Sequence, residues 1–206
     1  MKPHVFAGPE MSGSDVWGRE VCFERGKVYL IAAGSGKGKS SLFDFMYGRR
    51  GDYAGEILFD GKNAGTLNPD RKKELRRSHL GIVFQGFRMF PELTAMENVT
   101  IKNRLTNYKT KRQIEEMFEQ LDLSAKINAS VALLSFGQKQ RVAIIRALCQ
   151  PLDFLLLDEP FSHLDEANYT VACRLIAGEV KKQQAALLLT SLGEPYTFDY
   201  TRKMCL

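Results

Sequence analysis

Cysteine is scarce and widely spaced in this chain of 206 residues. No Cys-x-x-Cys pair and no closely spaced framework of the kind that staples small secreted domains is present. The pattern therefore excludes a disulfide scaffold and indicates a reducing cytosol. The four cysteines are Cys22, Cys149, Cys173 and Cys205.

Long apolar runs are also missing. The longest, Phe154–Leu157 and Ala185–Leu189, are far shorter than the roughly 20 residues that a helix needs to cross a bilayer. The first residues, Met1–His4, lead into a mixed, glycine-containing stretch and not into an apolar segment with a cleavage site. The sequence thus predicts neither a membrane span nor a secretion signal.

The chain has little excess charge of either sign. Lys and Arg number 29 against 24 Asp and Glu, so the net charge is +5, and no long basic tail is present. The densest basic group, Arg71–Arg77, has helix-like spacing and includes Glu74, which favours a solvated helix face. We therefore expect no nucleic-acid partner. The composition, 44% hydrophobic and 26% charged, is that of a single globular domain over residues 1–206.

Strand and helix patterns alternate along the first half of the chain. Val21–Phe23 and Val28–Ile31 have the composition of short strands, and Ser40–Met46 has the spacing of a buried helix. Ile57–Phe59 followed by Asp60-Gly61 predicts an antiparallel hairpin, because Asp-Gly supplies the positive φ of a two-residue turn.

The second half of the chain indicates a parallel sheet with many helices. Continuous apolar runs at Leu80–Phe84 and Phe154–Leu157 are typical of strands covered on both faces, and we expect them to flank a glycine-rich loop after Ile31. Three stretches have helical periodicity: Ala95–Leu121, Gly137–Leu148 and Ala167–Val180. We expect a last strand after them, near Ala186–Leu189.

The glycine-rich loop has the sequence Ala33-Gly34-Ser35-Gly36-Lys37-Gly38-Lys39-Ser40. Small residues between a strand and a helix let backbone N–H groups approach phosphate oxygens. Lys39 would place its ammonium against the β- and γ-phosphates, and Ser40 would offer its hydroxyl to Mg²⁺. A flexible Gly/Ser turn is the alternative. The predicted phosphate-binding residues are Gly34, Ser35, Gly36, Lys37, Gly38, Lys39, Ser40 and Ser41.

Two carboxylates, Asp158 and Glu159, directly follow the apolar run Leu155–Leu157. At the end of a buried strand, Asp158 can hold a Mg²⁺ ion while Glu159 polarises an attacking water. A solvent-exposed acidic turn before Pro160 is the alternative. Together with the glycine loop, this pair predicts binding of a nucleoside triphosphate with Mg²⁺.

A further segment, Leu134–Arg141 (LSFGQKQR), precedes the acidic strand, and with it nearly the whole sequence resembles an ATP-binding cassette (ABC) ATPase. Within this family, the run from Leu75 to Val99 is most similar to small bacterial cassettes for lipoprotein release, macrolide export and cell division. Other elements in the family's order are Phe84-Gln85, Pro91–Thr94, Glu97–Val99, Ser162–Asp165 and Leu188–Thr190.

The resemblance implies an α/β fold: a P-loop NTPase (RecA-like) core with a parallel sheet, an antiparallel β element and a helical subdomain. The core would comprise about residues 1–85 and 150–206, and the helical subdomain about residues 86–149. ATP and Mg²⁺ are the implied ligands, and ATP hydrolysis is the implied reaction. The implied location is peripheral, on the cytoplasmic face of the inner membrane.

The resemblance also implies partners. Two copies of the chain would form a homodimer that shares two ATP molecules, with Ser135, Gly137 and Gln138 completing the site of the opposite subunit. The N-terminus of the helix expected to begin at Gly137 would face the γ-phosphate, because the helix dipole favours negative charge there. Asp165 would lie at the dimer seam. A separately encoded transmembrane permease would insert a coupling helix into the groove after Gln85.

Two more residues receive roles by resemblance. Gln85 would sense Mg²⁺ and the attacking water, so it joins Ser40 and Asp158 as a metal-site residue. Phe6 lies where an aromatic residue that stacks on adenine is expected, although a simple packing role is an equal alternative. Glu159, Gln85 and Ser191 form the predicted catalytic set.

Four positions differ from the family pattern: Ala33 replaces the first loop glycine, Ser41 the commoner threonine, Phe136 the first signature glycine, and Ser191 a histidine. That histidine normally donates a hydrogen bond to the γ-phosphate in the transition state. A nucleotide-dependent scaffold that dimerises with little hydrolysis is therefore an alternative function. A soluble, nucleic-acid-associated cassette is another, suggested by the basic balance alone.

Slow turnover is the first testable expectation. Loss of one preorganised donor typically costs about 10²–10³ in rate, and a serine is too short to replace an imidazole without a bridging water. We expect the purified protein to bind Mg-ATP in a calorimetric titration yet to release phosphate slowly. Turnover near the enzyme median of about 10 per second would contradict this expectation.

Overall fold

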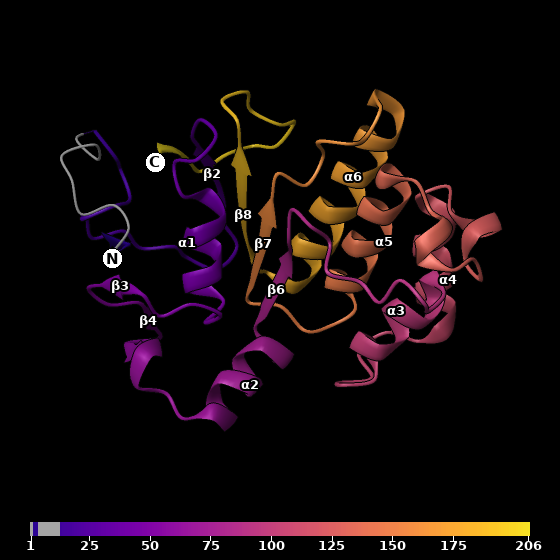
Figure 1. The fold of residues 1–206 in the computed structure, drawn as a ribbon, viewed down its shortest axis with the longest axis horizontal. Coiled ribbons are helices and arrows are strands. Elements are labelled where there is room, and N and C mark those ends of the chain that lie inside the picture. The colour runs from indigo at the N-terminus through magenta and orange to yellow at the C-terminus, as the bar shows by residue number, and fades with distance from the viewer. Residues whose placement is uncertain (1, 4–12) are drawn as a thin grey trace.

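One parallel β-sheet organises the computed structural model of the protein, which describes residues 2–3 and 13–206. Its five strands lie in the order β6-β7-β8-β2-β9, and each neighbouring pair runs parallel (Figure 1). The predicted α/β architecture is thus confirmed. The strands are β2 (Val28–Ala32), β6 (Leu80–Val83), β7 (Phe154–Asp158), β8 (Ala186–Ser191) and β9 (Arg202–Cys205).

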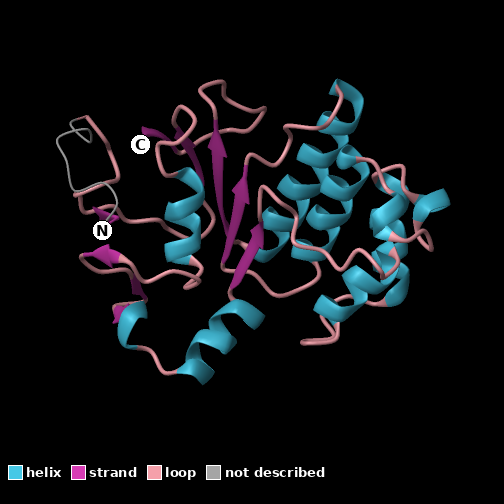
Figure 2. Cartoon of the chain, in the orientation of Figure 1, coloured by secondary structure: helices cyan, strands magenta, loops and turns pink. Residues whose placement is uncertain are grey.

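Helices cover both faces of this sheet, as Figures 1 and 2 show. Helix α1 (Lys39–Met46) packs on one face, and α5 (Phe136–Leu148) and α6 (Glu166–Gln183) pack on the other. Strand β7 serves both layers, because successive side chains of a strand point to opposite faces. Leu155 and Leu157 lie in the core beneath α5 and α6, whereas Leu156 lies in the core beneath α1.

Two small antiparallel ladders lie outside the main sheet. Strands β4 (Leu58–Phe59) and β5 (Lys62–Asn63) form the predicted hairpin around Asp60 and Gly61, whose φ angles are 48° and 75°. Both central residues of the turn are left-handed, as a two-residue hairpin of this type requires. The second ladder pairs β1 (Lys2–Pro3) with β3 (Tyr53–Ala54).

Three details of the fold differ from the sequence prediction. Val21–Phe23 forms no strand; Phe23 instead packs edge-on against the Tyr29 ring, with 5.0 Å between centroids. β6 and β7 do not flank the glycine loop, because β8 lies between β7 and β2. Strand β9 was missed, since a four-residue edge strand with one buried side chain, Met204, carries too little apolar pattern.

The predicted helical stretch between β6 and β7 is confirmed, but it consists of several pieces. Helix α3 (Ala95–Asn103) and helix α4 (Lys111–Gln120) are separate, and each begins with a capping box, at Thr94 with Glu97 and at Thr110 with Gln113. Such boxes satisfy backbone N–H groups that a helix start leaves unpaired. Short 3₁₀ turns occur at Ala64–Thr66, Ser124–Lys126 and Val131–Leu133.

The basic stretch forms helix α2 (Pro69–Ser78), which begins at the N-cap Asn68 and has no buried residue. This confirms the prediction of a solvated helix face. Within the described ranges, no helix is both long enough and apolar enough to cross a bilayer.

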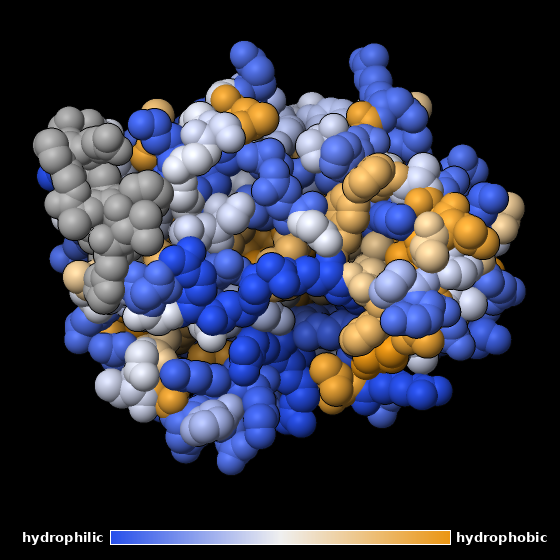
Figure 3. Space-filling view, in the orientation of Figure 1, coloured by the Kyte–Doolittle hydropathy of each residue, from blue (hydrophilic) through white to orange (hydrophobic). Residues whose placement is uncertain are grey.

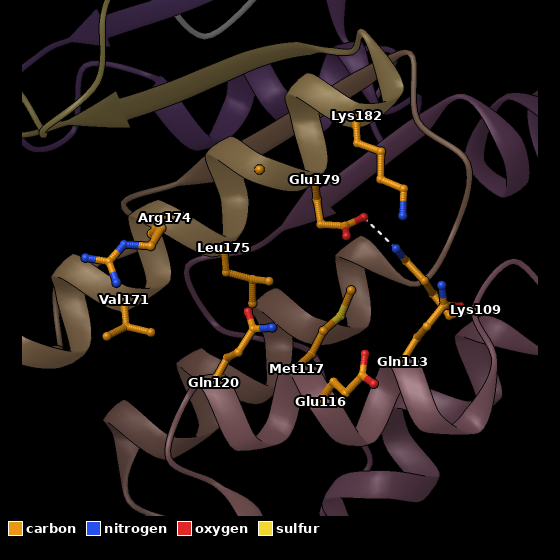
Figure 4. Close-up of a pocket in the computed structure, with 11 residues that line it drawn as sticks. Lys109, Gln113, Glu116, Met117, Gln120, Val171, Arg174, Leu175, Glu179 and Lys182 are labelled. Carbon is orange, nitrogen blue, oxygen red and sulfur yellow. Dashed lines mark hydrogen bonds and ion pairs between the residues drawn. The ribbon is translucent and has the colours of Figure 1, made fainter.

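A buried ion pair joins the segment before α4 to α6. Lys109 Nζ lies 2.5 Å from a carboxylate oxygen of Glu179, and the two side chains are only 3% and 14% exposed. Figure 4 shows them pointing toward each other at a pocket of about 540 Å³ between α4 and α6. This contact ties the helical segment to the layer that covers the sheet.

The ion pair generates a stability prediction. Breaking a buried pair by removing one partner leaves an uncompensated charge and costs about 3–5 kcal/mol. Lys109→Met should therefore lower the free energy of unfolding by about this amount in urea titrations. The double variant Lys109→Met/Glu179→Leu removes both charges and should recover much of the loss. A double variant no more stable than Lys109→Met would contradict this explanation.

Candidate nucleotide-binding site

The glycine loop lies at the carboxyl end of β2 and leads directly into α1. Gly36 and Gly38 have φ angles of 75° and 94°, and Gly38 is the N-cap of the helix. Side chains are disfavoured in this left-handed region, so both positions require glycine. The resulting backbone turns the loop around the first N–H groups of α1, which have no partner within the helix.

Gly34 requires a different explanation. Its φ is not positive, and a Cβ atom added there would meet no protein atom within 4 Å. Neither backbone strain nor packing against residues 2–3 and 13–206 accounts for this glycine. The same surroundings occur at Gly51, Gly86 and Gly178, so the contact of Gly34 with a phosphate stays a prediction that its open backbone permits.

Ala33, the first departure in the loop, is compatible with the observed backbone. Its φ is not among the positive values of the described residues, so an alanine is tolerated where the family has glycine. Its N–H donates to the Ser191 carbonyl over 3.1 Å, which anchors the loop to the end of β8.

The Lys39 ammonium is buried and contacts three oxygens. Nζ donates to the carbonyls of Ala33 (2.6 Å) and Gly34 (3.0 Å), and it lies 3.2 Å from Glu159 Oε1. A buried ammonium needs such partners, because an unpaired charge away from water is very costly. The predicted phosphate lysine and the predicted catalytic carboxylate are thus in direct contact.

Asp158 ends β7 with its side chain buried against two hydroxyl groups. The Thr190 hydroxyl donates to Asp158 Oδ1 over 2.8 Å, and the Ser40 hydroxyl also hydrogen-bonds to the carboxylate. Burial raises the pKa of Asp158, while these two hydrogen bonds act in the opposite direction. Hydroxyl and carboxylate oxygens are ligands that Mg²⁺ prefers, so Ser40 and Asp158 fit the predicted metal site.

Glu159 has an unusual backbone conformation. Its φ is 47°, in the left-handed region that costs a non-glycine residue on the order of 1–3 kcal/mol. Two hydrogen bonds support it: its N–H donates to the Thr190 hydroxyl over 3.0 Å, and its carbonyl accepts from Gln140 Nε2 over 3.3 Å. The conformation aims the carboxylate back toward Lys39.

Thr190 is a central residue that the sequence analysis did not identify as part of the site. Its buried hydroxyl contacts both the Asp158 carboxylate and the Glu159 N–H, and its carbonyl accepts from the Tyr196 hydroxyl over 3.1 Å. Burial raises the pKa of Tyr196, so the phenol remains a donor at neutral pH. In the sequence, Leu188–Thr190 was recognised only as an element of the family's order. The role of Thr190 was not recognised, because its hydroxyl contacts residues at the end of β7, which is distant in sequence.

Ser191 lies beside the loop, at the end of β8. It is buried and paired with Ala32 of β2, and its hydroxyl accepts from the Gly193 N–H over 3.3 Å. Its carbonyl accepts from the Ala33 N–H, so Ser191 lies next to the nucleotide loop, and its catalytic role stays a prediction.

A second set of predicted residues lies at the start of α5, without a hydrogen bond to the loop. Ser135 caps this helix and forms a capping box with Gln138. A Cβ at Gly137 would come 2.6 Å from the His163 carbonyl oxygen, so packing within the chain alone demands glycine there. Phe136 is 66% exposed, and its ring lies 5.3 Å from the His163 ring.

A short chain of hydrogen bonds connects Glu159 with α5 and with the loop before Asp165. Gln140 of α5 donates to the Glu159 carbonyl, and its side-chain oxygen accepts from the His163 N–H over 3.1 Å. Two residues later, Asp165 caps α6 by accepting from the Asn168 N–H. Hydrogen bonds from Asn168 lower the pKa of Asp165, which therefore stays ionised.

The remaining predicted residues are more separate. Gln85 is exposed after β6, and its side chain has no hydrogen bond within residues 2–3 and 13–206. Ser41 accepts a hydrogen bond from Arg50. Ser35 and Lys37 are exposed on the loop. Phe6 lies outside the described residues.

A glycine loop between a parallel strand and a helix, a buried lysine, and a hydroxyl-bound carboxylate on a nearby strand define a P-loop nucleotide-binding ATPase domain. The sequence matches the family described as ABC transporter over residues 18–162. The chain therefore belongs to the ABC transporter family and is an ATP-binding subunit that works with ATP and Mg²⁺. The resemblance inferred from its motifs is confirmed.

Individual relatives agree with this assignment. The chain is 31% identical over 178 residues to the ABC transporter ATP-binding protein YclH of Bacillus subtilis, covering 84% of this chain and 77% of YclH. It is 33% identical over 154 residues to the lipoprotein-releasing system ATP-binding protein LolD of Porphyromonas gingivalis, covering 73% and 70%. A solved dimer of the cassette MJ0796, bound to ADP and Pi, has a TM-score of 0.75 at 26% identity, covering 87% and 84%.

The position of Thr190 generates the prediction for this site. Thr190→Val keeps the side-chain shape but removes the hydroxyl, which leaves the buried Glu159 N–H without its partner and Asp158 with the Ser40 hydroxyl alone, at a cost of about 1–3 kcal/mol. We expect weaker Mg-ATP binding and slower hydrolysis in calorimetric and phosphate-release assays. Thr190→Ser retains the hydroxyl and serves as the matched control. Equal behaviour of the valine and serine variants would show that the hydroxyl is not needed.

Proposed function

We propose that this chain hydrolyses ATP between two copies of itself and passes the resulting motion to a separately encoded transmembrane partner. The observation that carries this proposal is the contact of Lys39 with Glu159, next to the Asp158 carboxylate and the glycine loop. The chain would work peripherally, on the cytoplasmic face of the inner membrane. Residues 86–149 would act as the helical subdomain of the cassette.

Phosphate binding falls to the loop and its lysine. The backbone around Gly34 leaves space for phosphate oxygens, and the Lys39 ammonium already lies beside that backbone. A triphosphate offers the ammonium stronger partners than two neutral carbonyls, because hydrogen bonds between ionised groups are roughly twice as strong. The remaining loop residues, from Ser35 to Ser41, would frame the same phosphates.

Ser40 and Asp158 would hold Mg²⁺, with Gln85 as a further ligand. A bound Mg²⁺ neutralises charge on the phosphate oxygens and polarises the phosphoryl group. Gln85 suits this role because its exposed side chain is not committed to another hydrogen bond within the described residues. Thr190 would orient Asp158 by holding one of its two carboxylate oxygens.

Glu159 would accept a proton from the attacking water. Its carboxylate is held by the strained backbone at φ 47° and by Lys39, so its position is fixed before substrate arrives. Ser191 would act near the γ-phosphate through a bridging water, which is a weaker arrangement than a direct imidazole donor.

The dimer would bring the start of α5 to the opposite subunit's nucleotide. Ser135 and Gln138 use their side chains to cap this helix, so their contribution to a phosphate would come from backbone N–H groups, the Ser135 hydroxyl proton and the helix dipole. Asp165 would lie at the seam and connect one site with the other. Exposure of Phe136 on the same helix end supports an intermolecular contact there.

The catalytic assignment is tested by Glu159→Gln. If Glu159 acts as general base, the replacement should lower the rate of phosphate release by roughly 10²–10⁴ while Mg-ATP binding persists. Glu194→Gln, an exposed carboxylate after β8, is the matched control and should behave as the original protein. Little change in the Glu159 variant would refute its role.

A companion variant addresses the missing histidine. Ser191→His should raise turnover, since it restores a direct donor whose loss typically costs about 10²–10³ in rate. Nucleotide-driven dimerisation, followed by light scattering in the same samples, separates a slow ATPase from a scaffold. Dimerisation without measurable phosphate release, even in Ser191→His, would favour the scaffold.

A further inference from the structure

Five aromatic side chains from three parts of the sequence pack together near the carboxyl end of β8. One follows β7, one lies in α6, and three lie in residues 192–201, the segment that loops over the end of β8 before β9 begins (Figure 1). We call this group the aromatic cluster. Its members are Phe161, Tyr169, Tyr196, Phe198 and Tyr200.

Phe161 forms the centre of the aromatic cluster. Its ring contacts the rings of Tyr169 and Tyr196 edge-on, with 5.1 and 4.9 Å between centroids. It also stacks on the Phe198 ring at 6.3 Å. Edge-on and offset-stacked arrangements are those that aromatic pairs favour. Because Phe161 comes two residues after Glu159, these contacts fix the chain directly beyond that carboxylate.

The phenol of Tyr196 reaches the same site from the end of β8. Its hydroxyl donates to the Thr190 carbonyl over 3.1 Å. The Thr190 hydroxyl in turn contacts the Asp158 carboxylate and the Glu159 N–H. Burial raises the pKa of Tyr196, and the negative charges of Glu159 and Asp158 raise it further. The phenol is therefore a donor at neutral pH and lies within electrostatic range of both carboxylates.

Tyr196 is itself held by two other tyrosines. Its N–H donates to the Tyr200 hydroxyl over 2.9 Å, and its carbonyl accepts from the same hydroxyl over 3.1 Å. The Tyr169 hydroxyl of α6 hydrogen-bonds to the side chain and to the N–H of Thr197. Residues 192–201 contain no helix or strand, so these side-chain contacts hold the segment in place.

Such support matters because the backbone of Glu159 is strained. A non-glycine residue keeps a φ of 47° only where its surroundings hold it there. Thr190 binds the Glu159 N–H, and Phe161 anchors the chain that follows Pro160. The aromatic cluster thus acts from two directions on the residue that the proposed function makes the general base.

The aromatic cluster is an internal support and not a docking surface. Phe161 is buried, and the other four rings are half-buried. In Figure 3, the upper part of the face, above β8, carries mainly blue and pale side chains with only small orange areas. Apolar patches that mark interaction sites are contiguous and larger than this.

We propose that Tyr196 is a positioning residue of the reaction: its phenol, held by the aromatic cluster, fixes Thr190 and through it the Glu159 carboxylate. The inference rests on the proposed function and deepens it by giving the segment between β8 and β9 a role in the chemical step. Within residues 13–206, Tyr196 makes no hydrogen bond to the glycine loop or to Lys39. Its loss should therefore affect the chemical step and leave nucleotide binding in place.

The test removes one hydroxyl group. Tyr196→Phe leaves the Thr190 hydroxyl present for Asp158 but frees the strand end that carries it. It should lower kcat for phosphate release about tenfold, because a small misplacement of a catalytic group is costly, while the KM for Mg-ATP changes less than about twofold. Thermal unfolding shows that the variant is folded.

The matched control is Tyr169→Phe. It removes a phenol from the same aromatic cluster, but this phenol bonds to Thr197 and not to the end of β8. A general loosening of the cluster would affect both variants equally. We expect Tyr169→Phe to keep kcat within about twofold of the original protein.

A double-mutant cycle tests the route through Thr190. In Thr190→Val the hydroxyl that transmits the effect is missing, so adding Tyr196→Phe should lower kcat further by less than about twofold. A structural weakening that does not act through Thr190 would lower kcat by the same factor in both backgrounds.

An unchanged kcat in Tyr196→Phe, an equal fall in Tyr169→Phe, or an equal effect of Tyr196→Phe with and without the Thr190 hydroxyl would overturn the inference and leave the proposed function intact. A rate of phosphate release that Glu159→Gln does not change would instead contradict the catalytic role of Glu159, on which both depend.

Discussion

The hydrogen bond from the Thr190 hydroxyl to Asp158, 2.8 Å long and buried, is the contact on which the arrangement of the site depends. It joins the ends of β8 and β7, while the bond from Ala33 to the Ser191 carbonyl joins the glycine loop to the same strand end. Because all three strands are parallel, their carboxyl ends meet at one edge of the sheet. The Lys39 ammonium and the carboxylates of Asp158 and Glu159 therefore come together at this edge, although they are far apart in sequence.

Two functional surfaces of the cassette are mechanically connected through Gln140. This side chain bridges the carbonyl of Glu159, beside the chain's own nucleotide loop, and the N–H of His163, against which Gly137 is packed. A displacement of Glu159 would move the start of α5 and the loop before Asp165 with it. Packed elements linked by directional bonds shift together because close-packed interiors deform little. The structure thus offers a short physical route between Glu159 and the helix start that the proposed dimer would bring to the opposite subunit's nucleotide.

Most of the fold could be predicted because its central elements carry strong local patterns. Runs such as Leu80–Val83 and Phe154–Leu157 are apolar on both faces, and the glycine loop identifies the strand and helix beside it. Strand order could not be predicted, since nothing in β8 indicates that it inserts between β2 and β7. The strand predicted at Val21–Phe23 was wrong, because a segment whose aromatic residue packs onto Tyr29 has the same apolar composition as a strand. In the site, Thr190 was missed because its hydroxyl acts through contacts with residues that are far away in sequence.

Gly137 illustrates how one close contact can limit sequence variation. Its α-carbon faces the His163 carbonyl so closely that even a methyl group would approach to 2.6 Å, and the obstructing atom belongs to the backbone, which cannot rotate away. Alanine, the smallest possible change, would act there as a wedge between α5 and the loop before Asp165. Natural variation at this position is thus restricted by geometry inside a single subunit, before any requirement of nucleotide chemistry applies. Conservation of such a glycine among relatives would therefore not, by itself, identify a ligand contact.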